Sequence, residues 1–104
     1  MNFGAYIKSL REAKRAEDPA FSLRRVAERA DIDYSYLSKL ENGVWTEPSE
    51  KVVLALADVL NADPDLLLAM TGRVSKTFQE ALMRRPDLFK EFLRLAREVR
   101  DGEW

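Results

Sequence analysis

The sequence contains no cysteine and no histidine. Without these residues the chain cannot form a disulfide, a thiolate or imidazole metal site, a Ser-His-Asp triad or a Cys-His nucleophile. No glycine-rich phosphate loop and no pattern of paired catalytic carboxylates takes their place. The sequence therefore predicts a protein that is not an enzyme and that holds neither a metal ion nor a cofactor.

Long hydrophobic runs are also missing. The longest fully apolar stretch, residues 52–57, has six residues, whereas a membrane-spanning helix needs roughly twenty. The first ten residues, MNFGAYIKSL, lack the basic region and apolar run of a secretory signal. The lack of cysteine is compatible with a reducing compartment. We therefore expect a cytoplasmic protein without a membrane partner.

The chain has no strong excess of charge of either sign. It has 104 residues and a formal net charge of −1, with 46% hydrophobic and 34% charged residues. This composition is typical of one compact globular core, and it excludes the global positive field of a nonspecific nucleic-acid coat. Acidic residues are concentrated in residues 44–72, where five Asp or Glu accompany one Lys.

Glycine and proline are scarce, with four of each, and they fall between segments whose apolar residues recur every three to four positions. No stretch alternates with period two, so the pattern predicts an all-α fold. Ser22, Asp33, Ser49 and Asp63 are expected N-caps. The expected helices cover about residues 3–16, 23–30, 34–42, 50–60, 64–72, 76–83 and 86–100.

The expected helix 34–42 has one apolar and one polar face. At about 100° per residue, Leu37 and Leu40 point toward the core, while Ser35, Lys39 and Asn42 lie near the opposite pole. Such a small polar face without a carboxylate suits the grooves of DNA, where it can bond to base edges and phosphates. Tyr34 and Tyr36 flank this face. Each tyrosine either contacts DNA or covers an edge of the core.

Glu41 falls at the inner edge of the same helix rather than on its polar face. A half-buried carboxylate needs a partner, and Arg11, beside Leu10 in the first helix, can hold it through two parallel hydrogen bonds. We expect Arg11 and Glu41 to form a structural ion pair.

Residues 22–43, SLRRVAERADIDYSYLSKLENG, are followed by Pro48-Ser49 and by Leu56-Ala57-x-x-Leu60. This run resembles the lambda-repressor/Cro-type (XRE-like) helix-turn-helix transcriptional regulators over about residues 3–72. The resemblance implies a five-helix DNA-binding bundle at residues 1–72. Residues 73–104 then form an extension of one or two helices, which we expect to serve in dimerisation.

The resemblance also implies roles for individual residues. Tyr34, Ser35 and Lys39 match positions that contact bases. Ser22, Ser38 and Asn42 match positions that contact phosphate, Asn42 largely through its backbone N–H. Arg11 and Glu41 match the buried ion pair of the family.

Two further phosphate candidates, Tyr36 and Arg25, come from the residues themselves and not from the resemblance. Arg24 and Arg25 are about equally well explained as solvated surface residues.

The last expected helix has an unusually wide apolar face, which spans an arc of about 160°, whereas a helix that lies on one surface needs roughly 100°. The excess favours a shared interface over simple docking on the chain's own bundle. The residues expected in a dimer interface are Leu88, Phe89, Phe92, Leu95, Ala96 and Val99.

These observations predict a homodimeric, sequence-specific transcriptional regulator, more specifically a repressor, with helix 34–42 in the major groove of double-stranded DNA at a palindromic operator. The alternative is an antitoxin-like or other interaction module whose C-terminal helices bind a partner protein. A stable homodimer that buries helix 86–100 favours the first function. A monomer with this helix exposed favours the second.

Overall fold

The computed structural model describes residues 2–44 and 47–101. The chain divides into two compact units, Met1–Arg73 and Val74–Trp104. Trp45 and Thr46, in the connection between the third and fourth helices, lie outside the described residues.

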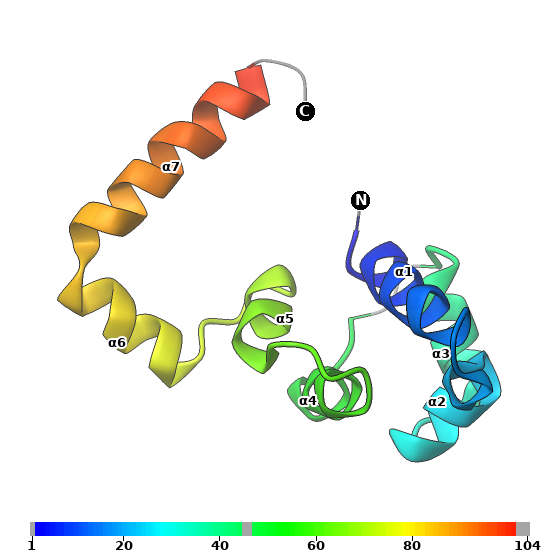
Figure 1. Ribbon diagram of the computed structural model, residues 1–104. Coiled ribbons are helices and arrows are strands. Elements are labelled where there is room, and N and C mark those ends of the chain that lie inside the picture. The colour runs from blue at the N-terminus through cyan, green and yellow to red at the C-terminus, as the bar shows by residue number, and fades with distance from the viewer. Residues whose placement is uncertain (1, 45–46, 102–104) are drawn as a thin grey trace. The chain divides into compact units, whose positions relative to one another are not determined.

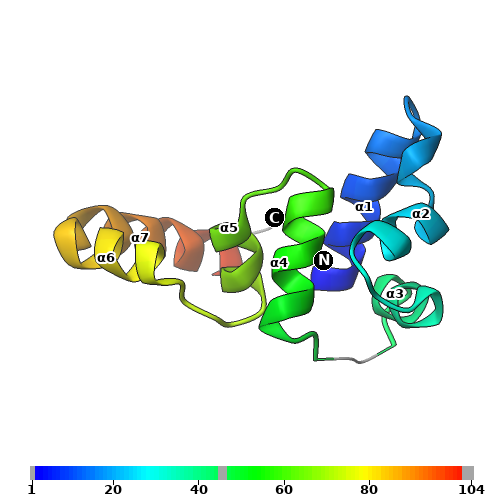
Figure 2. The same ribbon diagram turned by 90° about the horizontal axis from the view of Figure 1, so that it is seen from below.

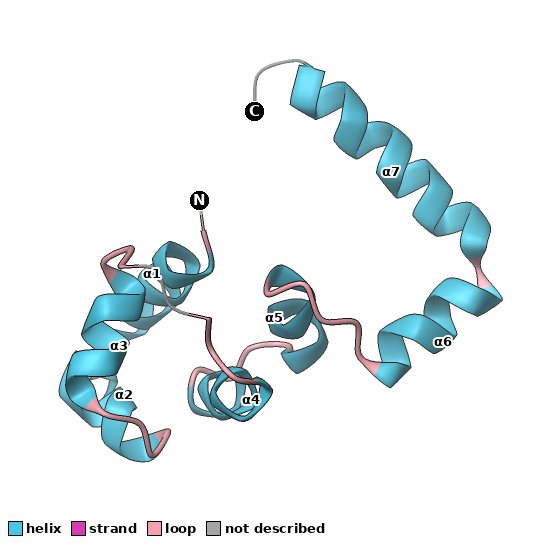
Figure 3. Ribbon diagram, turned by 180° about the vertical axis from the view of Figure 1, so that it is seen from behind, coloured by secondary structure: helices cyan, strands magenta, loops and turns pink. Residues whose placement is uncertain are grey.

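The fold is all-α, as predicted, and Figure 3 shows only helices and loops in the part of the chain that the structure describes. The helices are α1 (Phe3–Arg15), η1 (Pro19–Phe21, one 3-10 turn), α2 (Leu23–Arg29), α3 (Tyr34–Glu41), α4 (Glu50–Val59), α5 (Pro64–Met70), α6 (Lys76–Arg84) and α7 (Pro86–Asp101). The short η1 turn was not predicted. It occupies the long connection between the first two α-helices.

Polar side chains begin most of these helices. The four predicted N-caps, Ser22, Asp33, Ser49 and Asp63, each accept a hydrogen bond from a backbone N–H in the first turn of the helix that follows. These bonds satisfy donors that have no partner within the helix. The helix starts are therefore determined by local chemistry.

The turn after α2 places Asp31 in the left-handed region, with φ of 55°. The Ile32 N–H donates to Ala27 O at 2.9 Å, and the Asp31 N–H donates to Glu28 O at 3.1 Å. This pair of bonds is the Schellman arrangement, which ends a helix within two residues. It lets α3 begin almost directly after α2, so the two helices are joined by a tight turn.

The core of the first unit consists of apolar side chains from α1 to α5. Figures 1 and 2 show α4 between α5 and the group formed by α1, α2 and α3. The largest fully enclosed side chains are Ile7, Val26, Leu37, Val53, Leu56, Leu60 and Leu67. Because all five helices contribute, this shared core fixes the orientation of α3.

The second unit consists of α6 and α7. Phe78 of α6 and Phe89 of α7 meet edge to face, with ring centres 5.2 Å apart. Such an aromatic pair stabilises the contact between two helices beyond the area that it buries. The pair therefore joins the two helices of this unit.

Candidate nucleic-acid interface

The start of α3 is organised by Asp33, its N-cap. The carboxylate accepts hydrogen bonds from the Ser35 N–H at 2.8 Å and from the Ser35 hydroxyl at 2.5 Å, and a longer one from the Tyr36 N–H. These bonds favour the ionised form and lower the pKa of Asp33, with the Ser35 hydroxyl as the largest cause. The Ser35 hydroxyl hydrogen is thus engaged within the helix, and its oxygen remains available as an acceptor.

The three side chains that we expect to contact bases, Tyr34, Ser35 and Lys39, are all exposed on α3. The Tyr34 side chain is 44% exposed although it is a large aromatic residue. Lys39 has no carboxylate within ion-pair distance among the described residues. This face can therefore offer an ammonium group, a phenol and a hydroxyl oxygen to a ligand.

The residues that we expect to contact phosphate differ in their exposure and in the contacts that they already make within the bundle. Arg25 is exposed, and the Ser22 hydroxyl accepts a bond from the Arg25 backbone N–H at 3.3 Å. Tyr36 is partly buried and packs against the core. Of these residues, Arg25 has the most freedom to reach a phosphate.

Asn42 is more constrained than the resemblance implies. Its backbone N–H donates to Ser38 O at 3.0 Å. Its side-chain amide donates to the same oxygen at 2.8 Å and to the Ser38 hydroxyl at 3.3 Å. The backbone N–H that we expected to contact phosphate is therefore already used at the end of α3.

Arg24 contacts the start of α3, a relationship that sequence reasoning missed. Its guanidinium carbon lies 4.8 Å from the centre of the Tyr34 ring, within the range of a cation–π interaction. The two residues are on different helices, so only the packing of α2 against α3 brings them together. A solvent-facing Arg and a neighbouring exposed Tyr were the only signals in the sequence.

Arg11 and Glu41 are brought together inside the bundle. Arg11 Nε donates to Glu41 Oε2 at 2.8 Å, and Nη2 donates to Oε1 at 2.9 Å. The two side chains are 5% and 3% exposed. The Glu41 carboxylate raises the pKa of Arg11 by accepting these bonds. The pair connects α1 to the last turn of α3.

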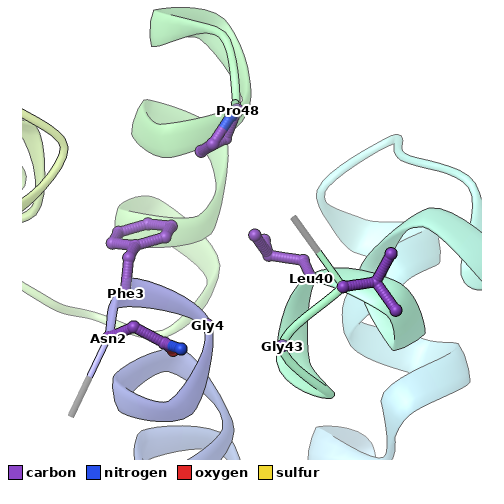
Figure 4. Close-up of a pocket in the computed structure, with 7 residues that line it drawn as sticks. Asn2, Phe3, Gly4, Leu40, Gly43 and Pro48 are labelled. Carbon is purple, nitrogen blue, oxygen red and sulfur yellow. The ribbon is translucent and has the colours of Figure 1, made fainter. Parts of the chain in front are cut away.

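The beginning of α1 also packs directly against the end of α3. A Cβ atom on Gly4 would lie 1.8 Å from the backbone oxygen of Leu40, so only glycine fits there. Beside this contact lies a hollow of about 160 Å³, which is shown in Figure 4. The lining that the structure describes includes Phe3, Leu40 and Pro48 and carries no titratable side chain, so these residues offer no acid, base or nucleophile.

No group of three or more acidic residues that could hold a metal ion occurs among the described residues. No helix in the described part of the chain has the length and apolar character needed to cross a membrane.

The residues that we expect in a dimer interface lie on α7. Leu88, Phe92 and Leu95 are exposed, with Phe92 at 64%. Ala96 and Val99 are partly covered. Phe89 is partly covered as well, and its ring packs against Phe78. The side chains that are most available for a partner are therefore Leu88, Phe92 and Leu95.

Two helices joined by a tight turn, with the polar face of the second helix exposed, define a helix-turn-helix protein. A family model described as "Helix-turn-helix domain" matches residues 2–70, and the chain belongs to this family. This membership indicates a DNA-binding regulator. Searches of curated proteins and of solved structures found no match.

Proposed function

We propose that the protein is a homodimeric transcriptional repressor that binds a palindromic operator with α3 in the major groove. The observation that carries this proposal is the exposed face of α3 within a helix-turn-helix domain. Tyr34, Ser35 and Lys39 are the candidates for base contacts. Repression follows if the occupied operator overlaps a promoter.

The phosphate contacts in this proposal come from both helices of the motif. Arg25 supplies a guanidinium from α2, and Ser22 supplies a hydroxyl at the start of that helix. Tyr36 and Ser38 supply weaker contacts from α3, whereas the backbone and side-chain donors of Asn42 are already bonded to Ser38. These groups fix the register of the domain on DNA but carry no sequence information.

Dimerisation is proposed because a single short helix contacts few base pairs. Two copies related by a two-fold axis double these contacts, with half-sites about 34 Å apart. Leu88, Phe92, Leu95 and Val99 follow one another at spacings of four, three and four residues. That spacing is the repeat of a coiled-coil seam. The seam is the surface through which α7 would meet a second copy.

Charges on α7 support the same arrangement. Arg94 forms ion pairs with Glu91 and Glu98 of its own helix. The hydrogen bond from Arg94 lowers the pKa of Glu91. Because the two carboxylates are partnered within the helix, they add less repulsion when two such helices approach.

The alternative is a partner protein rather than a second copy. Met83 of α6 and Leu88 and Phe92 of α7 are exposed at 76%, 54% and 64%, and such large apolar side chains often mark interaction sites. An antitoxin-like protein would use them to bind its target while the bundle binds DNA. The oligomeric state of the purified protein separates the two functions.

The test is fluorescence anisotropy with two labelled duplexes, the DNA upstream of the protein's own gene and a scrambled version, at several salt concentrations. Sedimentation equilibrium gives the oligomeric state in parallel. We expect preference for the native duplex and two protomers per site. A dimer that binds both duplexes equally would contradict operator recognition, and a monomer without DNA preference would favour the partner protein.

A further inference from the structure

Arg24 is a cation beside the recognition surface, the exposed face of α3 that includes Tyr34, Ser35 and Lys39. Its guanidinium lies over the Tyr34 ring at 4.8 Å, and Tyr34 is the first residue of α3. No acidic side chain of the described residues lies within ion-pair distance of Arg24. Both side chains are exposed. The guanidinium is thus held in place without being neutralised.

The aromatic contact has a physical consequence for recognition. A free arginine side chain loses rotamer entropy when it is fixed. A guanidinium that already rests on an aromatic ring has lost part of that freedom before the ligand arrives. The guanidinium group is planar and presents two parallel N–H donors, a fork that matches the O6 and N7 acceptors of guanine. This pairing is the commonest specific contact between proteins and DNA.

The other candidates on this surface are weaker donors. The Ser35 hydroxyl donates to Asp33, and Lys39 is a point charge without a fixed fork. Ser35 cannot supply two parallel hydrogen bonds to one base, and Lys39 can do so only from the single nitrogen of a flexible side chain. Among the residues around the start of α3, Arg24 is the one that combines such a fork with a fixed position.

We propose that Arg24, held against Tyr34, is a specificity-determining residue that contacts the major-groove edge of a guanine in each half-site. This inference rests on the proposed function, because it requires α3 to enter the groove. Tyr34 then has two roles, as a contact of its own and as the platform for Arg24. The recognition surface extends from α3 onto α2.

Arg29 provides a matched control on the same helix. Its guanidinium lies 4.9 Å from the Phe21 ring, and it donates to Ala20 O at 3.3 Å. It therefore makes the same kind of aromatic contact, but with the η1 segment rather than with α3. Arg29→Gln removes the same charge as Arg24→Gln and leaves the Tyr34 platform intact.

The experiment is selection of binding sites from a random duplex library by the full chain, followed by anisotropy on the selected duplex with each base pair changed in turn. The proteins are wild type, Arg24→Gln, Arg24→Lys, Arg29→Gln, Tyr34→Phe and Tyr34→Leu. Thermal unfolding of each variant verifies that it is folded.

If Arg24 contacts guanine, Arg24→Gln and Arg24→Lys lose preference at one G·C pair per half-site. Affinity for the selected duplex falls by about 5- to 150-fold, the range of one bidentate base contact. Arg29→Gln keeps the wild-type motif. Tyr34→Phe retains the ring and keeps the guanine preference, whereas Tyr34→Leu loses it.

Two results would overturn the inference while leaving the proposed function intact. In the first, Arg24→Gln selects the wild-type motif with unchanged preferences. In the second, Arg24→Gln weakens all duplexes equally while Arg24→Lys restores binding, which assigns Arg24 to phosphate. A wild-type protein that selects no motif would overturn the proposed function, and this inference with it.

Discussion

Arg11 and Glu41, thirty positions apart in the chain, form a bidentate ion pair at 2.8 and 2.9 Å in the interior of the bundle. Arg11 also donates to Phe21 O at 3.3 Å. One guanidinium thus joins α1, the η1 segment and the last turn of α3. The C-terminal end of α3 is held by this pair, whereas its N-terminal end is held by Asp33.

Removing one partner of this pair should destabilise the fold strongly. We expect Glu41→Gln or Arg11→Met alone to lower the free energy of unfolding by about 3–5 kcal/mol, because the remaining partner loses its counter-charge in the interior. The double variant Arg11→Met/Glu41→Leu should recover most of the loss. Urea denaturation gives the free energy of unfolding of all three variants. Single variants that lose less than about 1 kcal/mol would show that water reaches the pair.

The contact of Gly4 with Leu40 gives a second stability prediction. Alanine at an exposed helical position is favoured over glycine by about 0.8–1 kcal/mol. At Gly4, however, the added Cβ would meet the Leu40 oxygen, and overpacking costs about 1–3 kcal/mol. We therefore expect Gly4→Ala to lower the melting temperature. Ser9→Ala, at an exposed position of α1, is the control, and a more stable Gly4→Ala protein would contradict the contact.

Much of the fold could be predicted because its signals are local. The helix starts are marked by N-cap residues whose side chains bond to backbone N–H groups two or three positions further on. These residues are Ser22, Asp33, Ser49 and Asp63. The left-handed residue after α2 was harder to place, because Asp31 occupies a position where glycine is the usual signal. A capping bond can also be hidden in the sequence, as with the Ser35 hydroxyl, which we assigned only to DNA.

The candidate site was harder to predict from the sequence than the fold, because it depends on tertiary packing. The helical period places Lys39 on an outward face, and this follows from one helix alone. The approach of Arg24 to Tyr34 follows only from the angle and distance between α2 and α3, which no residue pattern encodes directly. For Asn42 the helical period predicts which face of α3 the residue lies on. It does not predict the bonds to Ser38 that compete with a phosphate contact.

Lys39 gives a prediction for the proposed base contacts. If Lys39 contacts a base edge, Lys39→Ala should cost about 1–3 kcal/mol of binding free energy at the preferred duplex and relax the preference at one base pair. Lys51→Ala, which removes the same charge from an exposed position of α4, is the control. A loss that is equal for all duplexes, with a smaller salt dependence, would assign Lys39 to phosphate instead.

The lowered pKa of Asp33 can be measured by following its side-chain carboxyl carbon by NMR as pH is lowered. Because the folded pKa lies below the ordinary value of 3.8, the carboxylate stabilises the fold above that value. The contribution is lost as pH falls through the lowered pKa. Ser35→Ala should raise the pKa toward 3.8, whereas Ser38→Ala should leave it unchanged. An unshifted Asp33 in the wild type would contradict the hydroxyl bond.

The apolar seam of α7 gives a prediction for assembly. Phe92 lies in the middle of the seam and is 64% exposed, so Phe92→Glu should place a carboxylate in the proposed interface without disturbing the bundle of the first unit. Two buried carboxylates related by a two-fold axis would lack counter-charges, which is unfavourable in an apolar contact. We expect a monomer by sedimentation equilibrium, with weaker binding to a palindromic duplex and little change in binding to a single half-site. Lys90→Glu, a charged position on the same helix outside the seam, should remain dimeric. If Phe92→Glu is still a dimer, the two copies meet through another surface, and α7 is free to bind a different protein.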